Sequence, residues 1–372
     1  MTDKILMMIE PRCILMIKGH SMGVGDLLRS SAAWRALHDR FPGVKLHLLF
    51  LSKHAGYPSE ELMRDHHLLA SVRFVTIREG SPNQSQARRV PMAQIVAEVN
   101  AFAKQVKPDL VIDFESSGVR SSWIARQAAK ACHSVSLGIA QFPGRSFFYD
   151  LASPSVRAYR KRHHLPEMMD YTERDFVVLA GLGIERRGTA IELNLTQSGA
   201  VVAKSLRQRV PSDRLIIGLN IGCGTPDAMP RRPDLNALAE AIQALTQVQP
   251  CSLVLSGAPF EHEVNEEFMA LYQSRFGSNI PMLNAAGETS MSGLTGLISI
   301  CDIFVSSDSG PYHLAVAMRK PTLAWFVREE PPAMHQVPWC ACLINPHPKE
   351  FVLAANHLRR ASASMESPTH TE

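Results

Sequence analysis

Two segments of the chain place an acid beside glycine directly after an apolar run. In one, Asp308, Ser309 and Gly310 follow such a run and precede a helical pattern. Pro311 suits the first helical position, and Asp308 or Ser309 can cap the free amides. The amides and the positive dipole end at this helix N-terminus suit a diphosphate, and the acid beside them can hold sugar hydroxyls. The segment therefore predicts a nucleotide-sugar site.

The other segment is a glycine-rich turn that contains Gly23, Gly25 and Asp26 and leads into a strongly amphipathic pattern. From spacing alone, the first interpretation of Asp26 is a helix N-cap. The alternative is a carboxylate at the end of a strand that acts as a general base. The turn lacks the third glycine of the dinucleotide fingerprint, and no clear acid ends the second strand, so NAD binding is not expected.

A third strand end is followed by Gly222, Gly224 and Thr225, and then by Arg231 and Arg232. Glycines let backbone amides approach a phosphate, and an arginine can neutralise a leaving diphosphate. For one arginine alone, the simpler interpretation is a solvated loop before a helix.

Three more side chains lie near the predicted ends of strands in the second half. Thr289 and Ser290 precede a helix, so capping is their first role and donor contact their second. His313 lies one turn into the helix that follows Gly310. It is either a packed helix residue or a phosphate donor, and its position in the motif favours the phosphate donor.

A basic run between the two halves contains Arg157, Arg160 and Lys161. It is either a solvated helix face or a contact for an anionic acceptor or for lipid headgroups. Both interpretations remain open. The neighbouring pair His163 and His164 has no third ligand at a useful spacing, so no metal site is expected.

Short apolar runs alternate with helical patterns throughout. The runs are residues 13–17, 46–51, 74–77, 110–114 and 135–139 in the first half, and 215–220, 253–256, 303–306 and 322–326 in the second. Such alternation predicts the α/β class, with two doubly wound, Rossmann-like domains. Ligands of such domains bind where the strands end, so a cleft faced by both domains is the expected site.

The expected organisation has five parts. These are an N-terminal domain at 1–165, a helical linker at 166–210, a C-terminal donor domain at 211–345, a C-terminal helix at 346–362 and a disordered tail at 363–372.

Composition limits the class of protein. The chain has 372 residues, a net charge of +4 and seven cysteines. The charge is too small to indicate nucleic-acid binding, but it is compatible with an acidic substrate or an anionic membrane. The odd number of cysteines without a framework spacing predicts reduced thiols and a cytoplasmic location. No apolar stretch approaches the roughly 18 residues of a membrane-spanning helix.

Several of these segments resemble one known family. Residues 14–18, 22–26, 33–37 and 41–43 are similar to the opening of the ADP-heptose:lipopolysaccharide heptosyltransferase family, glycosyltransferase family 9. The segment from Ser307 to Ala317, with Ala286–Met291 before it and Lys320-Pro321 after it, resembles the second hallmark of that family.

The resemblance implies a GT-B fold and an inverting glycosyltransferase that needs no metal or other cofactor. It further implies transfer of heptose from ADP-heptose to a lipopolysaccharide core or a related envelope glycan. Asp26 would be the base, with Gly23 and Gly25 on the acceptor side. Asp308 would hold the sugar, while amides at Ser309 and Gly310 would hold the diphosphate together with a basic residue, Arg231 first. Peripheral contact with the inner face of the inner membrane is a further expectation.

The chain departs from the family pattern in three places. The loop before Asp26 is about two residues longer than usual, Val327 stands where a glycine usually follows the late strand, and Arg231-Arg232-Pro233 is a reduced signature. A different nucleotide-sugar donor and a non-catalytic nucleotide-sugar-binding protein are therefore kept as alternatives. A third is an isomerase or hydrolase without an acceptor, for which Asp113 and Glu115 are candidate acids.

Overall fold

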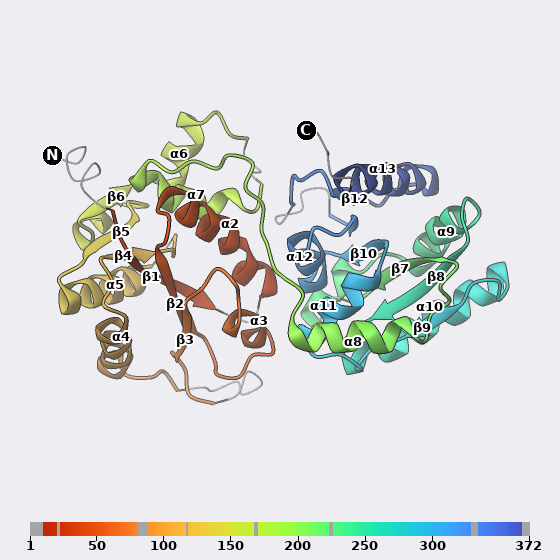
Figure 1. The fold of residues 1–372 in the computed structure, drawn as a ribbon, viewed down its shortest axis with the longest axis horizontal. Helices are drawn as coiled ribbons and strands as arrows, with labels where there is room; N and C mark the ends of the chain where they lie inside the picture. Colours follow the sequence, from red (N-terminus) through yellow and green to blue (C-terminus); the bar gives the residue numbers. More distant parts are fainter. Residues whose placement is uncertain are drawn as a thin grey trace, which may run out of the picture. The chain divides into compact units, whose positions relative to one another are not determined.

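The computed structural model describes residues 10–20, 23–80, 88–116, 118–166, 170–222, 226–328 and 334–366. The chain divides into two compact units between Ile191 and Glu192. Each unit contains one parallel six-stranded sheet with helices on both faces (Figure 1). The predicted α/β class is therefore confirmed, and the division falls inside the range expected to be a linker.

The sheet of the first unit has the order β3-β2-β1-β4-β5-β6. Its strands are β1 (Cys13–His20), β2 (Lys45–Ser52), β3 (Ser71–Thr76), β4 (Leu110–Asp113), β5 (Val135–Ile139) and β6 (Leu151–Ser153). Its helices are α2 (Val24–Arg40), α3 (Glu60–Arg64), α4 (Met92–Val106), α5 (Val119–Cys132), α6 (Val156–Arg162) and α7 (Glu173–Leu179), with short 3-10 turns at Arg145–Phe148 and Ala180–Leu182. Side chains alternate along β1, so Leu15 and Ile17 join the core that includes α4 and α5, whereas Lys18 meets α7.

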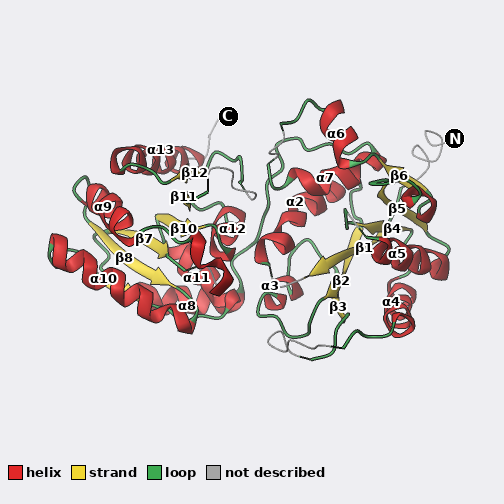
Figure 2. Cartoon of the chain, turned by 180° about the vertical axis from the view of Figure 1, so that it is seen from behind, coloured by secondary structure: helices red, strands yellow, loops and turns green. Residues whose placement is uncertain are grey.

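The second unit repeats this topology with the order β12-β11-β10-β7-β8-β9. Its strands are β7 (Leu215–Asn220), β8 (Cys251–Ser256), β9 (Met282–Asn284), β10 (Ile303–Ser307), β11 (Thr322–Phe326) and β12 (Cys340–Ile344). Its helices are α8 (Gln197–Arg207), α9 (Leu235–Thr246), α10 (His262–Phe276), α11 (Met291–Ile300), α12 (Gly310–Ala317) and α13 (Pro348–Glu366), with 3-10 turns at Pro226–Arg231 and Pro259–Glu261. The core of this unit joins side chains of α9, α10 and α13 with those of β7, β8 and β10. These elements can be located by their labels in Figure 2.

Helix α8 is held against α11 by a contact between glycines. A Cβ atom at Gly199 would lie 2.1 Å from Oγ1 of Thr295, and one at Gly296 would lie 2.0 Å from the carbonyl oxygen of Gly199. Thr196 caps α8 by accepting a hydrogen bond of 2.9 Å from the amide of Gly199. The two helices can approach this closely only because both positions lack side chains.

Strand order fixes where ligands can bind in each unit. Both units have the doubly wound order 3-2-1-4-5-6 when their strands are counted along the chain. In this topology, the connections leave in opposite directions from strands 1 and 4, which opens a crevice at their carboxyl ends. The crevices are therefore expected after β1 and β4 in the first unit and after β7 and β10 in the second.

Candidate functional site

Asp26 lies at the carboxyl end of β1, as predicted, but it is not a helix cap. Helix α2 begins at Val24 with Gly23 as its N-cap, so Asp26 is the third helical residue. There its Oδ1 accepts hydrogen bonds from Nη1 of Arg29 at 3.0 Å and from the hydroxyl of Tyr171 at 2.8 Å. The N-cap interpretation is wrong because the helix begins at Val24, three residues before the start that an N-cap at Asp26 would give.

The surroundings of Asp26 favour its ionised form. Burial opposes ionisation, but the charges of Arg29 and Lys18 and the hydrogen bond from Tyr171 together lower the pKa of Asp26. The side chain remains 49% exposed. Both hydrogen bonds go to Oδ1, and no residue in the described part of the chain bonds to Oδ2. Asp26 thus presents one open carboxylate oxygen at the first crevice.

Behind Asp26 lies a buried ionic cluster that the sequence does not indicate. Asp175 of α7 accepts from Nζ of Lys18 at 3.0 Å and from Nε of Arg29 at 3.0 Å, and it also accepts from the hydroxyl of Ser30. Burial raises the pKa of Asp175, but Arg29 and Lys18 outweigh burial and lower it. The cluster ties α7 to β1 and α2.

Asp113 and Glu115, the candidate acids of an isomerase or hydrolase, both have hydrogen-bond partners within the first unit. Asp113 is fully buried and accepts from the hydroxyl of Tyr149 at 2.6 Å and from Arg145 at 3.4 Å. Burial raises the pKa of Asp113 to about 6. Glu115 accepts from the amide of Gly19 at 2.7 Å. The Glu115 contact joins the ends of β1 and β4, and the Asp113 contacts join β4 to the segment 145–149, so both acids have structural roles.

In the second unit, the start of α12 lies at the carboxyl end of β10. Ser309 is the N-cap, but its hydroxyl donates to Oδ1 of Asn220 at 3.0 Å rather than accepting from the amides of the helix. Gly310 is the first helical residue, so Pro311 occupies the second position rather than the predicted first. Because the N-cap side chain is engaged elsewhere, the first amides of α12 keep their capacity to bind an anion.

Two arginines and two acids surround this helix end. Arg231 Nη1 lies 3.8 Å from Oδ2 of Asp308, and Arg232 Nη2 lies 3.9 Å from Oε1 of Glu261. Burial raises the pKa of Asp308, opposed by Arg231 and Arg328. Within the described residues, Nε of Arg232 is buried without a hydrogen-bond partner. The structure therefore brings the predicted Arg231 and Asp308 together and leaves donor capacity on Arg232.

Glu261 was not predicted, although it determines the shape of the loop after β7. Its Oε2 accepts from the amide of Ala258 at 2.7 Å, and a Cβ atom at Gly222 would lie only 1.6 Å from its Oε1. Gly222 is thus required for this close approach, and its carbonyl accepts from the hydroxyl of Ser307 at 2.6 Å. The sequence signal that could have identified Glu261 is its position as the first acid after the turn that follows β8. The predicted Gly224 and Thr225 lie outside the described residues.

The remaining donor-side predictions have defined positions. Ser290 caps α11 by accepting from the amide of Gly293 at 3.1 Å, which confirms its first interpretation, and the partly buried Thr289 precedes it. His313 is buried on α12, with its Nδ1 2.9 Å from Nε2 of His335. His335, on the segment before β12, was not predicted.

The basic run forms α6, which belongs to the first unit. Arg157 and Lys161 are exposed, and Arg160 donates from Nε to the carbonyl of Pro166 at 3.1 Å. The buried Tyr159 joins α6 to α7 by donating to Glu173 at 2.7 Å. Helix α6 therefore packs on the same segment that supplies Tyr171 to Asp26.

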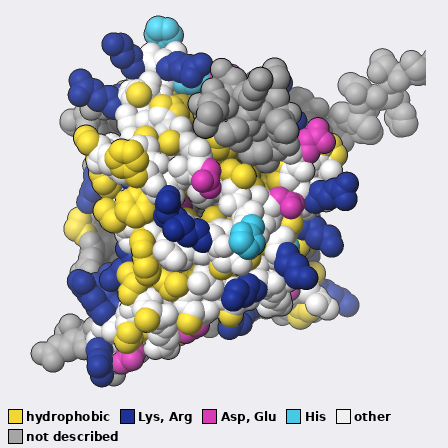
Figure 3. Space-filling view, turned by 90° about the vertical axis from the view of Figure 1, so that its left-hand side faces the viewer, with side chains coloured by type: hydrophobic (Ala, Val, Ile, Leu, Met, Phe, Trp, Pro, Cys, Tyr) yellow, Lys and Arg dark blue, Asp and Glu magenta, His cyan; other side chains and the backbone are white. Residues whose placement is uncertain are grey.

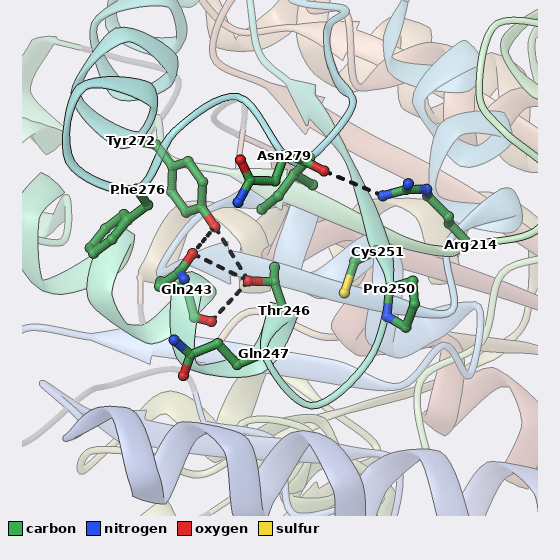
Figure 4. Close-up of a pocket in the computed structure, with 10 residues that line it drawn as sticks. Arg214, Gln243, Thr246, Gln247, Pro250, Cys251, Tyr272, Phe276 and Asn279 are labelled. Carbon is green, nitrogen blue, oxygen red and sulfur yellow. Dashed lines mark hydrogen bonds between the residues drawn. The ribbon is translucent and has the colours of Figure 1, made fainter.

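A separate pocket of about 230 Å³ lies at the opposite edge of the second sheet. It is lined by the ends of α9 and α10 and the start of β8 (Figure 4). Gln243 accepts from the hydroxyls of Tyr272 and Thr246 there, and Nη1 of Arg214 donates to the carbonyl of Asn279. Because this edge carries the amino ends of the strands, the pocket is distinct from the crevice after β7 and β10.

Known proteins show what this arrangement is similar to. Over 112 residues, the chain is 33% identical to lipooligosaccharide heptosyltransferase 2 of Campylobacter jejuni, which covers 30% of this chain. The match with this chain covers only 33% of the length of that curated relative, about a third.

Solved structures share the fold over nearly the whole chain. A glycosyltransferase family 9 structure from Veillonella parvula has a TM-score of 0.68 at 15% identity and covers 93% of this chain and 97% of its own. The E. coli heptosyltransferase WaaC with ADP has a TM-score of 0.57 at 20% identity, covering 95% of this chain and 99% of its own. At these identities, the likeness confirms the two-sheet fold that the sequence predicts.

The family assignment comes from a longer match. Residues 100–344 match the model of glycosyltransferase family 9 (heptosyltransferase), which is more than half of the chain. This range includes β4, the segment that supplies Tyr171 and Asp175, and the strand ends of β7 and β10, whereas Asp26 lies before it. The chain therefore belongs to glycosyltransferase family 9, the heptosyltransferase family.

Proposed function

We propose that this chain transfers a heptosyl group from ADP-heptose to a hydroxyl of a lipopolysaccharide core or related envelope glycan, with inversion at the anomeric carbon. The observation that carries the proposal is the ionised Asp26 with an open Oδ2 at the crevice of its unit. Family membership supports the reaction class. The names of the similar proteins, a heptosyltransferase with ADP and a lipooligosaccharide heptosyltransferase, support the donor and acceptor.

The donor would bind in the second unit. Its diphosphate fits the first amides of α12, beside Arg231 and beside Nε of Arg232, which has no hydrogen-bond partner among the described residues. Asp308 lies within reach of the same helix end and would accept from hydroxyls of the sugar. The described residues contain no group of three metal-ligating side chains. In this proposal, the two arginines and the helix amides stabilise the leaving diphosphate, and neither a metal nor another cofactor takes part.

The chemical step is a single displacement. Oδ2 of Asp26 takes the proton of an acceptor hydroxyl while that oxygen attacks the anomeric carbon. The new glycosidic bond forms on the face opposite the leaving group, and the bond to the diphosphate oxygen breaks. The electron pair leaves on the nucleoside diphosphate, and the proton passes from Asp26 to solvent. A carboxylate whose pKa is held low is ionised at neutral pH, so Oδ2 carries no proton before the step.

The acceptor side of the first unit suits a partner at an anionic membrane. Among the exposed large hydrophobic residues, a group that we call the apolar surface lies on α5 and the loop after β5: Val119, Trp123, Phe142 and Phe147. Phe147 is 82% exposed. Figure 3 shows hydrophobic side chains gathered on one side of this face, with Lys and Arg side chains around them.

One hydrogen bond holds the two parts of the apolar surface together, and another joins the loop after β5 to the basic helix. Arg126 of α5 donates to the carbonyl of Phe147 at 2.6 Å, and Gln141 accepts from the amide of Val156, the first residue of α6, at 3.0 Å. Exposed aromatic residues beside Lys and Arg are typical of surfaces that lie on anionic lipid. No helix in the described ranges is long and apolar enough to cross a bilayer. We therefore propose peripheral contact with the cytoplasmic face of the inner membrane, with Arg157, Arg160 and Lys161 meeting headgroups or an anionic acceptor.

The role of Asp26 is tested by Asp26→Asn. Loss of the general base should lower the rate of transfer by about 10²–10⁴-fold. Binding of ADP, which needs only the second unit, should remain. The rate is measured with ADP-heptose and a lipid-free acceptor, and binding by the shift in melting temperature. At about 100 times its dissociation constant, a ligand adds about 2.7 kcal/mol to stability.

Asp39→Asn is the matched control, because Asp39 is an exposed acid of the same helix. It should leave both rate and binding unchanged. Unchanged turnover in Asp26→Asn would remove Asp26 from the role of base. If UDP or GDP raised the melting temperature and ADP did not, the chain would still be proposed as a transferase, but with a different nucleotide-sugar donor. Turnover of the donor with no acceptor present would favour the isomerase or hydrolase, and binding without any turnover would favour a non-catalytic protein.

A further inference from the structure

One guanidinium group connects Asp26 with the buried carboxylate of Asp175. Arg29 donates from Nε to Oδ1 of Asp175 and from Nη1 to Oδ1 of Asp26, each at 3.0 Å. Asp175 also pairs with Lys18 at 3.0 Å, and the side chains of Lys18 and Asp175 are each 2% exposed. Two cations and two carboxylates thus form a cluster of zero net charge, in which Asp26 is the most exposed member.

The geometry has a consequence for the open oxygen of Asp26. A guanidinium is planar and binds a carboxylate best through two parallel hydrogen bonds. Because Asp175 engages Nε, the group is held so that only Nη1 reaches Asp26. Tyr171 occupies the same oxygen, Oδ1. Without Asp175, Arg29 could turn and bind both oxygens of Asp26, and one excess positive charge would remain beside the base.

We propose that Tyr171 and Asp175 are positioning residues for Asp26, which hold Oδ1 and leave Oδ2 open to the acceptor hydroxyl. The proposal rests on Asp26 being the base of the proposed function. It assigns a role in the reaction to the segment 170–179, which the sequence indicates only as a linker. Neither residue needs to touch a substrate, because both act through the placement and charge of Asp26.

The pH dependence follows from the charges that act on this cluster. They belong to Lys18 of β1, Glu115 after β4, Arg29 of α2, and Tyr171, Arg174 and Asp175 of the α7 segment. Asp175→Asn removes a negative charge, so the ionised form of Asp26 gains stability and its pKa falls. Tyr171→Phe removes a hydrogen bond to the ionised form, so the pKa of Asp26 rises. The two variants therefore shift the acid limb of the kcat/KM profile in opposite directions.

The experiment measures pH–rate profiles for the whole chain and for Asp175→Asn, Tyr171→Phe and Asp39→Asn. Asp175→Asn should lower kcat on the order of 10-fold, with the acid limb moved to lower pH and the KM for donor unchanged. Tyr171→Phe should move the limb to higher pH, and Asp39→Asn should not move it. Limbs that stay in place, or that move in the same direction in both variants, would overturn the proposal.

A double-mutant cycle separates positioning from a purely structural effect. If Asp175 acts through Asp26, adding Asp175→Asn to Asp26→Asn should cause no further loss of rate. An equal further loss in that background would show that Asp175 acts independently of Asp26. Should Asp175→Asn not fold, the same cycle with Tyr171→Phe, which removes one hydroxyl, decides the question. If Asp26→Asn alone leaves the rate unchanged, the proposed base itself fails, which is a distinguishable result.

Discussion

Asp308 meets two opposing demands at one side chain. The side chain is buried beside Arg231. Burial raises the pKa of Asp308, although the positive charge of Arg231 opposes the rise. A carboxyl group whose pKa is higher in the folded than in the unfolded state destabilises the fold when it is ionised. This cost is present at neutral pH and disappears as pH falls through the folded-state pKa. The proposed contact with sugar hydroxyls explains why a costly acid is placed there.

Asp308→Asn should therefore stabilise the second unit at pH 7 while lowering the rate of transfer. The neutral amide removes the cost of the buried charge, and it loses the charged acceptor for sugar hydroxyls. Melting curves of the variant and the parent chain should converge as pH is lowered, because Asp308 then becomes protonated. Asp213→Asn, at an exposed acid of the same unit, is the control. A stabilisation that grows at low pH would contradict this account.

The chemistry of single residues was predictable only where it follows the chain. Asp308 follows an apolar run closely, and Asp26 ends the glycine-rich turn after another such run, so their positions near strand ends could be inferred. Tyr171 and Asp175 could not, because their contacts with Asp26 and Lys18 span 145 and 157 residues. Nothing in the sequence near Asp175 indicates that its partners lie on β1 and α2.

At the scale of elements, the glycine contact between α8 and α11 determines how α8 is attached to the second unit. Gly296→Val would place side-chain atoms where the backbone of Gly199 lies. Overpacking of this kind costs about 1–3 kcal/mol, and each kcal/mol lowers the melting temperature by about 2–4 °C in a unit of this size. Calorimetry should show the loss in the second unit.

Val201→Ala supplies the comparison for Gly296→Val. Val201 lies on α8 with 69% exposure, so its truncation should leave the melting temperature nearly unchanged. Equal melting of Gly296→Val and the parent chain would show that α8 moves away without cost. In that case, the glycines would not be needed for the contact.

The central strands were predictable, and so was the edge strand β3, which overlaps the predicted run 74–77, but the edge strands β6, β9 and β12 were not. Strands β1, β2, β4, β7, β10 and β11 are buried on both faces and appear as continuous apolar runs. Strands β6 and β9 have three residues each, and β6 and β12 lie at sheet edges with partly exposed positions. Their periodicity is too short to detect. Helix α13 continues to Glu366, beyond the expected end at 362, because alanine in its last turns favours helix.

At the scale of the whole molecule, the apolar surface predicts binding to lipid. The chain should bind vesicles that contain anionic lipid and should bind neutral vesicles weakly, with salt reducing the difference. Phe147→Ser should weaken binding about 10-fold, because a buried Phe contributes about 1.5–3 kcal/mol. Activity on a lipid-free acceptor should not change. Co-sedimentation measures the binding.

The control for Phe147→Ser is Leu353→Ser on α13, a residue of the second unit with 71% exposure. Equal losses in the two variants would show general adhesion of apolar side chains. If neither substitution weakened binding and only salt reduced it, the contact with lipid would be made by the basic residues of α6. If the chain bound no vesicle, the membrane proposal would fail, and the apolar surface would be interpreted as a contact for a protein partner or a second copy of the chain.

The repeated strand order has a consequence for how such a protein can change over time. The two units share one topology, yet their sequences show no internal repeat. The crevice in each unit is set by the direction in which connections leave the sheet and needs no particular side chain. Drift in sequence can therefore erase the likeness of the two halves without moving either crevice. In the first unit the acid follows strand 1, and in the second it follows strand 4. The two units thus carry an aspartate on opposite sides of the same topological position.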